Sequence, residues 1–160
     1  MACAVYVETS IVSYLAGRPS RDLIVAARQR LTHTWWRPRR SAFGLYISQV
    51  VLDEAKAGDP DAAQRRAEFM GDVPILDMPS EVADLAAALI ESVPLPPKAA
   101  ADATHIALAA YHEVDYLLTW NLAHIANAEL RPRIEQVCRD RGYSPPILCT
   151  PDELMGEPDE

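Results

Sequence analysis

The stretch "AVYVETSIVSYLAG", residues 4–17, decides the fold because it places a charged side chain directly after an apolar strand. Residues 4–7 are typical of a buried strand. Ser10 is expected to cap a short helix that ends near Gly17. Burying an unpaired carboxylate costs on the order of several kcal/mol. Glu8 is therefore expected either to reach solvent in the turn or to meet a positive group.

Further strands and helices alternate along the rest of the chain. Strands are expected at 45–47, 73–78, 115–119 and 146–150. Helices are expected at 20–37 with Ser20 as the cap, at 48–57 with Ser48 as the cap, and from 59 onward with Asp59 as the cap and Pro60 at the first position. Further helices are expected at 80–92, 95–112, 129–141 and from the capping box at 150–153. Parallel strands need crossover connections, which these helices supply. In open parallel sheets the working site lies beyond the carboxyl ends of the strands. Glu8 occupies such a position.

Length and composition indicate one globular domain. The chain has 160 residues, of which 49% are hydrophobic. We expect a single domain over residues 1–155, followed by a disordered acidic tail at 156–160. No apolar run reaches the roughly 18 residues of a membrane span, and the N-terminus has no signal-peptide pattern. The three cysteines fit neither a zinc pattern nor a disulfide framework, so a reduced, cytoplasmic protein with no membrane partner is expected.

The charge distribution is uneven. The net charge of −8 argues against a broad basic surface that holds nucleic acid. Arginines nevertheless gather between Arg28 and Arg40, around Trp35 and Trp36, on the helix that Pro38 is expected to stop. This segment has two interpretations: a surface that binds RNA, or an amphipathic helix with core tryptophans and solvated arginines. The pattern slightly favours the second.

Two acids lie on apolar helix faces, Glu54 with Val50 and Val51, and Asp102 with Ala99 and Ile106. Asn121 follows the strand at 115–119, so it lies at a strand end like Glu8. Carboxylate and amide oxygens are the ligands that Mg²⁺ and Mn²⁺ prefer. Such sites activate water for attack on phosphorus. Each acid alone is more commonly a boundary residue that reaches water.

The chain resembles the PIN-domain family, in particular the VapC-like toxins of bacterial toxin–antitoxin pairs. The resemblance rests on "VYVETSIVSYL", "ISQVVLDEA", "PPKAAADATHIALAA" and "DYLLTWNLAHIANA", in that order. It implies a three-layer α/β/α sandwich with a mainly parallel central sheet. It also implies an endoribonuclease that depends on Mg²⁺ or Mn²⁺.

The resemblance assigns the site residues one by one. The family's first, second and third acids map to Glu8, Glu54 and Asp102, which are expected to hold the metal directly or through water. The family's last polar position maps to Asn121, expected to assist by coordination or through a bound water. This chain departs from the family at two positions. The first acid is commonly Asp and here is Glu8, and the last position is commonly Asp and here is Asn121.

Several neighbours of these residues are candidates for supporting roles. Thr9, Ser10 and Thr119 have hydroxyls that can hydrogen-bond the carboxylates. His105 can orient Asp102 or touch substrate, although a satisfied, half-buried histidine is the commoner case. Trp120 can stack on a base, or it can belong to the core.

The resemblance also implies partners. These are an RNA substrate, a small antitoxin protein for which the segment from Arg28 to Arg40 is a further candidate surface, and a second copy in a homodimer. The alternative function is a PIN-fold module that binds RNA or protein with little or no nuclease activity. A small-molecule hydrolase is disfavoured because the sequence has no nucleophile motif such as G-x-S-x-G.

Overall fold

The computed structural model describes residues 2–156 of the chain and contains a five-stranded sheet. The strands are β1 (Cys3–Val7), β2 (Phe43–Ser48), β3 (Ile75–Leu76), β4 (Tyr116–Leu118) and β5 (Ile147–Cys149). They lie in the order β3-β2-β1-β4-β5, and every pairing is parallel. The carboxyl ends of β1, β2 and β4 therefore point to the same edge, and β1 lies at the centre.

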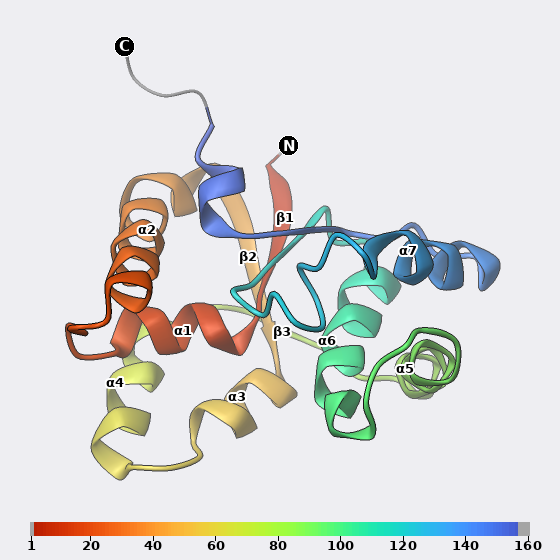
Figure 1. Cartoon of the computed structure of the whole chain (residues 1–160), viewed down its shortest axis with the longest axis horizontal. Coiled ribbons are helices and arrows are strands. Elements are labelled where there is room, and N and C mark those ends of the chain that lie inside the picture. The colour runs from red at the N-terminus through yellow and green to blue at the C-terminus, as the bar shows by residue number, and fades with distance from the viewer. Residues whose placement is uncertain (1, 157–160) are drawn as a thin grey trace.

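Helices cover both faces of the sheet. They are α1 (Thr9–Ala16), α2 (Leu23–Arg39), α3 (Gln49–Ala55), α4 (Pro60–Met70), α5 (Ser80–Ser92), α6 (Ala100–Tyr111) and α7 (Arg131–Asp140). In Figure 1, α1, α2 and α4 lie on one side of β1 and β2, while α5, α6 and α7 lie on the other. This arrangement confirms the three-layer α/β/α sandwich expected from the sequence.

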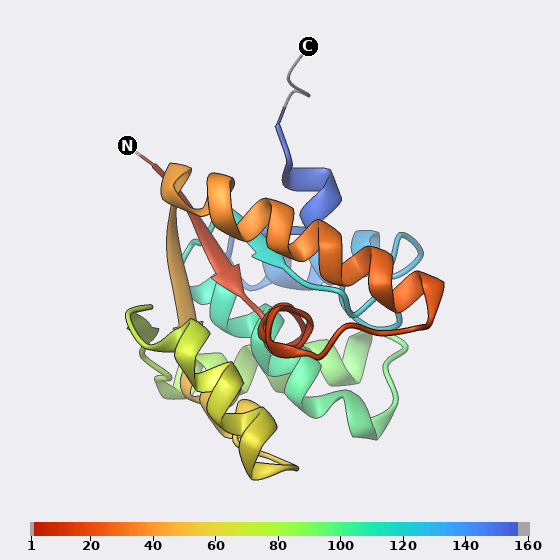
Figure 2. The ribbon, with the colours of Figure 1, turned by 90° about the vertical axis from the view of Figure 1, so that its left-hand side faces the viewer.

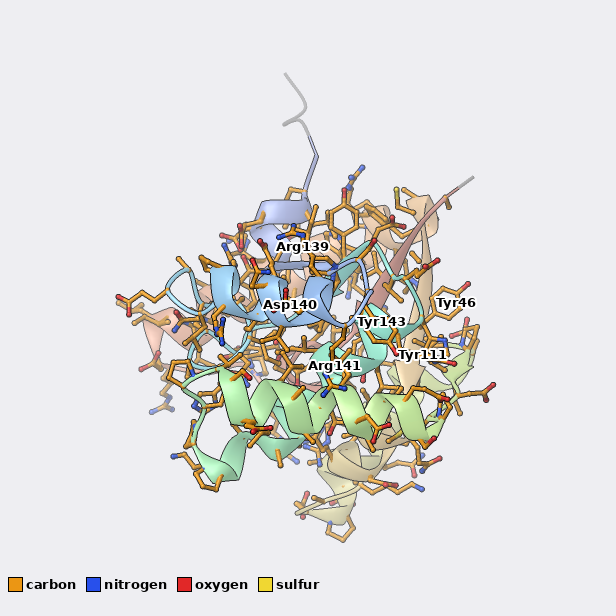
Figure 3. The ribbon with its side chains drawn as sticks, turned by 90° about the vertical axis from the view of Figure 1, so that its right-hand side faces the viewer. Tyr46, Tyr111, Arg139, Asp140, Arg141 and Tyr143 are labelled. Carbon is orange, nitrogen blue, oxygen red and sulfur yellow. The ribbon has the colours of Figure 1, made fainter. Side chains whose placement is uncertain are left out.

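The central strand forms the middle of the core. Val5, Tyr6 and Val7 are fully buried, as a parallel strand covered on both faces should be. On the face that Figure 3 shows, α5 and α7 run beside each other, and α5 packs against α6. Tyr111 at the end of α6 and Tyr143 after α7 approach with ring centroids 6.0 Å apart, which fastens the end of α7 to this layer.

Helix α2 departs from the sequence-based expectation at both ends. It begins at Leu23, because Asp22 rather than Ser20 caps it by accepting a hydrogen bond from the Val25 N–H. Pro38 does not stop it, and the helix runs to Arg39. Pro38 removes one backbone donor from the last turn, and the helix ends one residue after the proline rather than before it.

The buried face of α2 also differs from the one that the helical spacing of Ile24, Ala27, Leu31 and Trp35 predicts. Trp35 is fully buried and Trp36 nearly so, whereas Ile24 is 65% exposed and lies outside the core. Figure 2 shows why: α2 crosses over α1, so its first turns project beyond the sheet. The tryptophans thus belong to the core, as the amphipathic interpretation predicted.

The remaining elements agree with the expected ones within a few residues. The helix expected at 95–112 opens with a short 3₁₀ turn, Pro97–Ala99, and becomes α-helical at Ala100. The capping box at Thr150 and Glu153 is present and begins the 3₁₀ turn Pro151–Leu154. No helix within residues 2–156 is both long and apolar enough to cross a membrane. Of the expected tail, residues 157–160 lie outside the described part of the chain.

Candidate metal centre

Glu8 is buried at the carboxyl end of β1, with only 5% of its surface exposed. It caps α1 itself: its Oε2 accepts from the Ser10 N–H at 3.1 Å, and its Oε1 accepts from the Ser10 Oγ at 2.6 Å. Thr119 Oγ1 donates to the same Oε1. Neutral donors satisfy Glu8 and it does not reach solvent, so that expectation was wrong. The expectation that Glu8 meets a positive group stays a prediction, with a metal ion as that group. Ser10 serves Glu8 and is not the cap.

Thr119 and its neighbour tie the end of β4 to the end of β1. The Trp120 N–H donates to Ser10 Oγ at 2.8 Å, so that Ser10 links Glu8 to the chain after β4. The Trp120 ring is buried, its Nε1 donates to Thr32 Oγ1 on α2 at 2.7 Å, and the Arg28 guanidinium lies 5.4 Å from its centre. In this structure Trp120 packs between the site and α2.

Glu54 reaches the same edge from α3, which Ser48 caps at the end of β2. Its Oε1 accepts from Thr9 Oγ1 and from His105 Nε2, each at 2.6 Å. Partial burial raises the pKa of Glu54, but the hydrogen bonds from His105 and Thr9 outweigh it, so the pKa lies below its ordinary value. Its neighbour Asp53 turns away and accepts from Gln49, four residues earlier on the same helix.

His105 is fully buried on α6 and contacts Glu54 rather than Asp102. Its Nδ1 lies 2.6 Å from the Tyr6 hydroxyl, which in turn lies 2.7 Å from Ser48 Oγ. Burial raises the pKa of Tyr6, so its hydroxyl stays protonated at every working pH. Sequence reasoning missed Tyr6 and gave Ser48 only a capping role. An aromatic side chain in a strand and a serine before a helix both have ordinary structural explanations.

Three side chains bring potential ligand atoms together. Glu8, Glu54 and His105 each offer an atom within 4.8 Å of the others. Two carboxylates and an imidazole suit a divalent cation of the Mn²⁺ class, and the two carboxylates also suit Mg²⁺. The grouping matches the predicted pair of Glu8 and Glu54, and it adds His105, which the sequence suggested only as a supporting residue.

Asp102 and Asn121 make other contacts. Asp102 lies in the first turn of α6, partly exposed, and its Oδ2 is 2.9 Å from His124 Nδ1. Asn121 Oδ1 accepts from the His124 N–H at 3.0 Å, so the amide oxygen caps the turn after β4. His124 therefore joins the last two predicted site residues to each other. Their predicted roles toward a metal stay predictions.

The family model described as the PIN domain matches residues 5–129, which is most of the chain and includes all the residues discussed above. No curated protein gives a significant match to the sequence.

Two solved structures share the fold. One is a chain of VapBC2 from Rickettsia felis bound to a DNA fragment from their promoter, with a TM-score of 0.56 and 13% identity, covering 92% of this chain and 98% of that one. The other is a chain of FitAcB from Neisseria gonorrhoeae, with a TM-score of 0.55 and 14% identity, covering 92% and 97%. At these identities the likeness concerns the fold alone.

Proposed function

Because the chain belongs to the PIN-domain family, we propose that it is a metal-dependent endoribonuclease and the toxin of a toxin–antitoxin pair. The observation that carries this proposal is the convergence of Glu8, after the end of β1, and Glu54, on the helix α3 that follows the neighbouring strand β2. Two carboxylates so close together repel each other unless a cation or a proton lies between them. A divalent cation is the natural occupant.

In this proposal Glu8 and Glu54 hold Mg²⁺ or Mn²⁺ directly, and Asp102 contributes directly or through a water. Asn121 assists through its amide. When bound there, the ion lowers the pKa of an attacking water and stabilises the charge that builds up on the phosphate. Thr9, Ser10 and Thr119 fix the carboxylates by hydrogen bonds, which is the usual work of side chains behind metal ligands.

The charge distribution supports RNA as the substrate. Residues 18–52 contain seven arginines and a single acid, Asp22, so they carry +6 within a chain of net charge −8. Arg30 and Arg37 line a shallow depression of about 280 Å³ on the outer side of α2. No salt bridge of the described residues involves either of them. Unpaired guanidinium groups are the usual contacts for phosphates.

The antitoxin partner and the homodimer rest on the family resemblance. The Rickettsia felis neighbour is a VapBC2 complex, which supports a small protein partner for this chain as well. Leu23 and Ile24, at the start of α2, are 86% and 65% exposed. An open apolar pair of this kind supports an interface, either with a second copy or with the partner.

The alternative is an RNA- or protein-binding module that cuts poorly, and Asn121 favours it. Its amide replaces the acid common in the family, and its oxygen is engaged in capping the turn at His124. The pocket therefore has one negative charge fewer to hold a metal.

Cleavage assays test the proposal. Purified wild type should cut single-stranded RNA with Mg²⁺ or Mn²⁺ and stop when EDTA is added. Glu8→Gln should lower the rate by at least about 100-fold, because it removes a ligand charge from the site. Asp53→Asn, one residue from Glu54 but facing solvent, should cut at the wild-type rate.

Two other outcomes of these assays would count against parts of the proposal. RNA binding without metal-dependent cleavage would establish the alternative. Equal cleavage by wild type and Glu8→Gln would remove Glu8 from the site.

A further inference from the structure

We infer that His105 is a positioning residue for Glu54, held in one orientation and one tautomer by Tyr6 and Ser48. The inference concerns the metal centre of the proposed function and rests on that function for its catalytic meaning. The chain of contacts runs from Ser48 through Tyr6 and His105 to Glu54, with distances of 2.7, 2.6 and 2.6 Å.

Counting donors and acceptors determines which atom donates in each of these hydrogen bonds. An ionised carboxylate only accepts, so His105 Nε2 must carry the proton it donates to Glu54. In the neutral imidazole Nδ1 is then an acceptor, and the Tyr6 hydroxyl donates to it. Ser48 donates to the Tyr6 oxygen, while its own oxygen accepts from the Val51 N–H. In this arrangement the Ser48 and Tyr6 hydroxyl hydrogens and the His105 Nε2 hydrogen each have an acceptor.

The opposite direction leaves a donor without a partner. If His105 Nδ1 donated to Tyr6, the Tyr6 hydroxyl would donate to Ser48, and the Ser48 hydrogen would have no acceptor among the contacts of the described residues. Tyr6, Ser48 and His105 are each fully buried, so no water is at hand to take that hydrogen. A buried unsatisfied donor costs about 1–3 kcal/mol.

This chain of contacts determines which oxygen of Glu54 accepts no hydrogen bond. Thr9 and His105 both donate to Oε1, and no hydrogen bond of the described residues reaches Oε2. Two donors on one oxygen fix the rotation of the carboxylate about its last bond. Oε2 is left as the oxygen that can bind a cation, and His105 Nε2, which carries a proton, is not itself a ligand.

Nitrogen NMR tests the tautomer on the metal-free protein. In ¹⁵N-labelled wild type at pH 7.5, long-range ¹H–¹⁵N spectra should show a protonated Nε2 and an unprotonated Nδ1 for His105. The signal is assigned by its absence from His105→Gln. In Tyr6→Phe the Nδ1 signal should move downfield, because the nitrogen loses its hydrogen bond.

A matched variant controls for the loss of a hydroxyl. Tyr46 lies beside Tyr6 in register on β2, and its hydroxyl makes no hydrogen bond to the described residues. Tyr46→Phe should leave the His105 nitrogen signals unchanged. Calorimetric titration with Mn²⁺ alone should then show a Kd about tenfold weaker for Tyr6→Phe and unchanged for Tyr46→Phe.

The outcomes separate this inference from the proposed function. An unprotonated Nε2 would make His105 a candidate ligand and overturn the inference, and protonation of both nitrogens would overturn the donor direction. Equal Mn²⁺ affinity of Tyr6→Phe and wild type would show that the chain of contacts does not serve the site. Absence of RNA cleavage would refute the proposed function but would leave the tautomer result intact.

Discussion

At the scale of single residues, the hydrogen bonds to Glu54 make stability depend on pH. A carboxyl whose pKa is lowered by folding stabilises the protein above its unfolded pKa of about 4.3, and this contribution is lost as pH falls through the folded value. Thr9→Val removes one donor to Glu54 with little change of shape. We expect it to cost about 1 kcal/mol at pH 7, at the low end for a charged hydrogen bond because Glu54 is partly exposed.

The dependence on pH distinguishes this effect from lost packing. The difference in melting temperature between wild type and Thr9→Val should be about 2–4 °C at pH 7 and should shrink as pH falls below about 4. Thr34→Val removes a hydroxyl that bonds only the Arg30 carbonyl. Its effect should not change with pH. A constant difference for Thr9→Val from pH 8 to pH 3 would contradict the ionic origin.

At the scale of elements, α2 combines two functions on different faces. Trp35 and Trp36 anchor it in the core, while Arg30 and Arg37 lie two turns apart on the outer face. If RNA crosses this face, Arg30→Glu with Arg37→Glu should weaken binding to a Glu8→Gln variant that does not cut. It should also reduce the slope of log K against log salt by about 1.4, the value for two single-strand phosphate contacts.

The control reverses the same number of charges on the opposite side of the molecule. Arg139 and Arg141 lie near the end of α7, on the face shown in Figure 3. Arg139→Glu with Arg141→Glu should leave RNA affinity close to that of the parent. Equal losses for both pairs would mean that net charge alone, and not the outer face of α2, governs binding.

The sequence predicted elements best where one local rule sufficed. Asp59 with Pro60, Ser48 and the box at Thr150 each mark a helix start by their own chemistry, and the structure confirms all three. The start of α2 was wrong because Ser20 and Asp22 are both good caps. The choice between them depends on where α2 crosses α1, which is a tertiary property.

The sequence predicted two of the three side chains that converge, Glu8 and Glu54, but not the hydrogen bonds that connect them. Glu8 and Glu54 were found because a charge after a strand and a charge on an apolar helix face are both anomalous. Tyr6 carries no such signal, because a tyrosine fits a strand without further explanation. The contact of His105 with Glu54 joins side chains 51 positions apart, and only the packing of α3 beside α6 creates it.

At the scale of the whole molecule, metal binding should appear as stability. The edge of the sheet gathers acids from β1 and α3 in the folded chain only, so a cation that binds there favours the folded state. At a concentration 100 times its Kd, Mn²⁺ would add about 2.7 kcal/mol. For a chain of this size that gain corresponds to a rise in melting temperature of roughly 5–10 °C.

The same measurement decides the role of Asp102. Glu54→Gln should abolish the metal-dependent rise, because Glu54 is one of the two converging carboxylates. If Asp102 is a ligand, Asp102→Asn should reduce the rise by half or more. If it serves only His124, the variant should melt lower without metal yet gain as much from Mn²⁺ as wild type. The gain on adding metal, rather than the melting temperature itself, therefore separates a third ligand from a structural hydrogen-bond partner of His124.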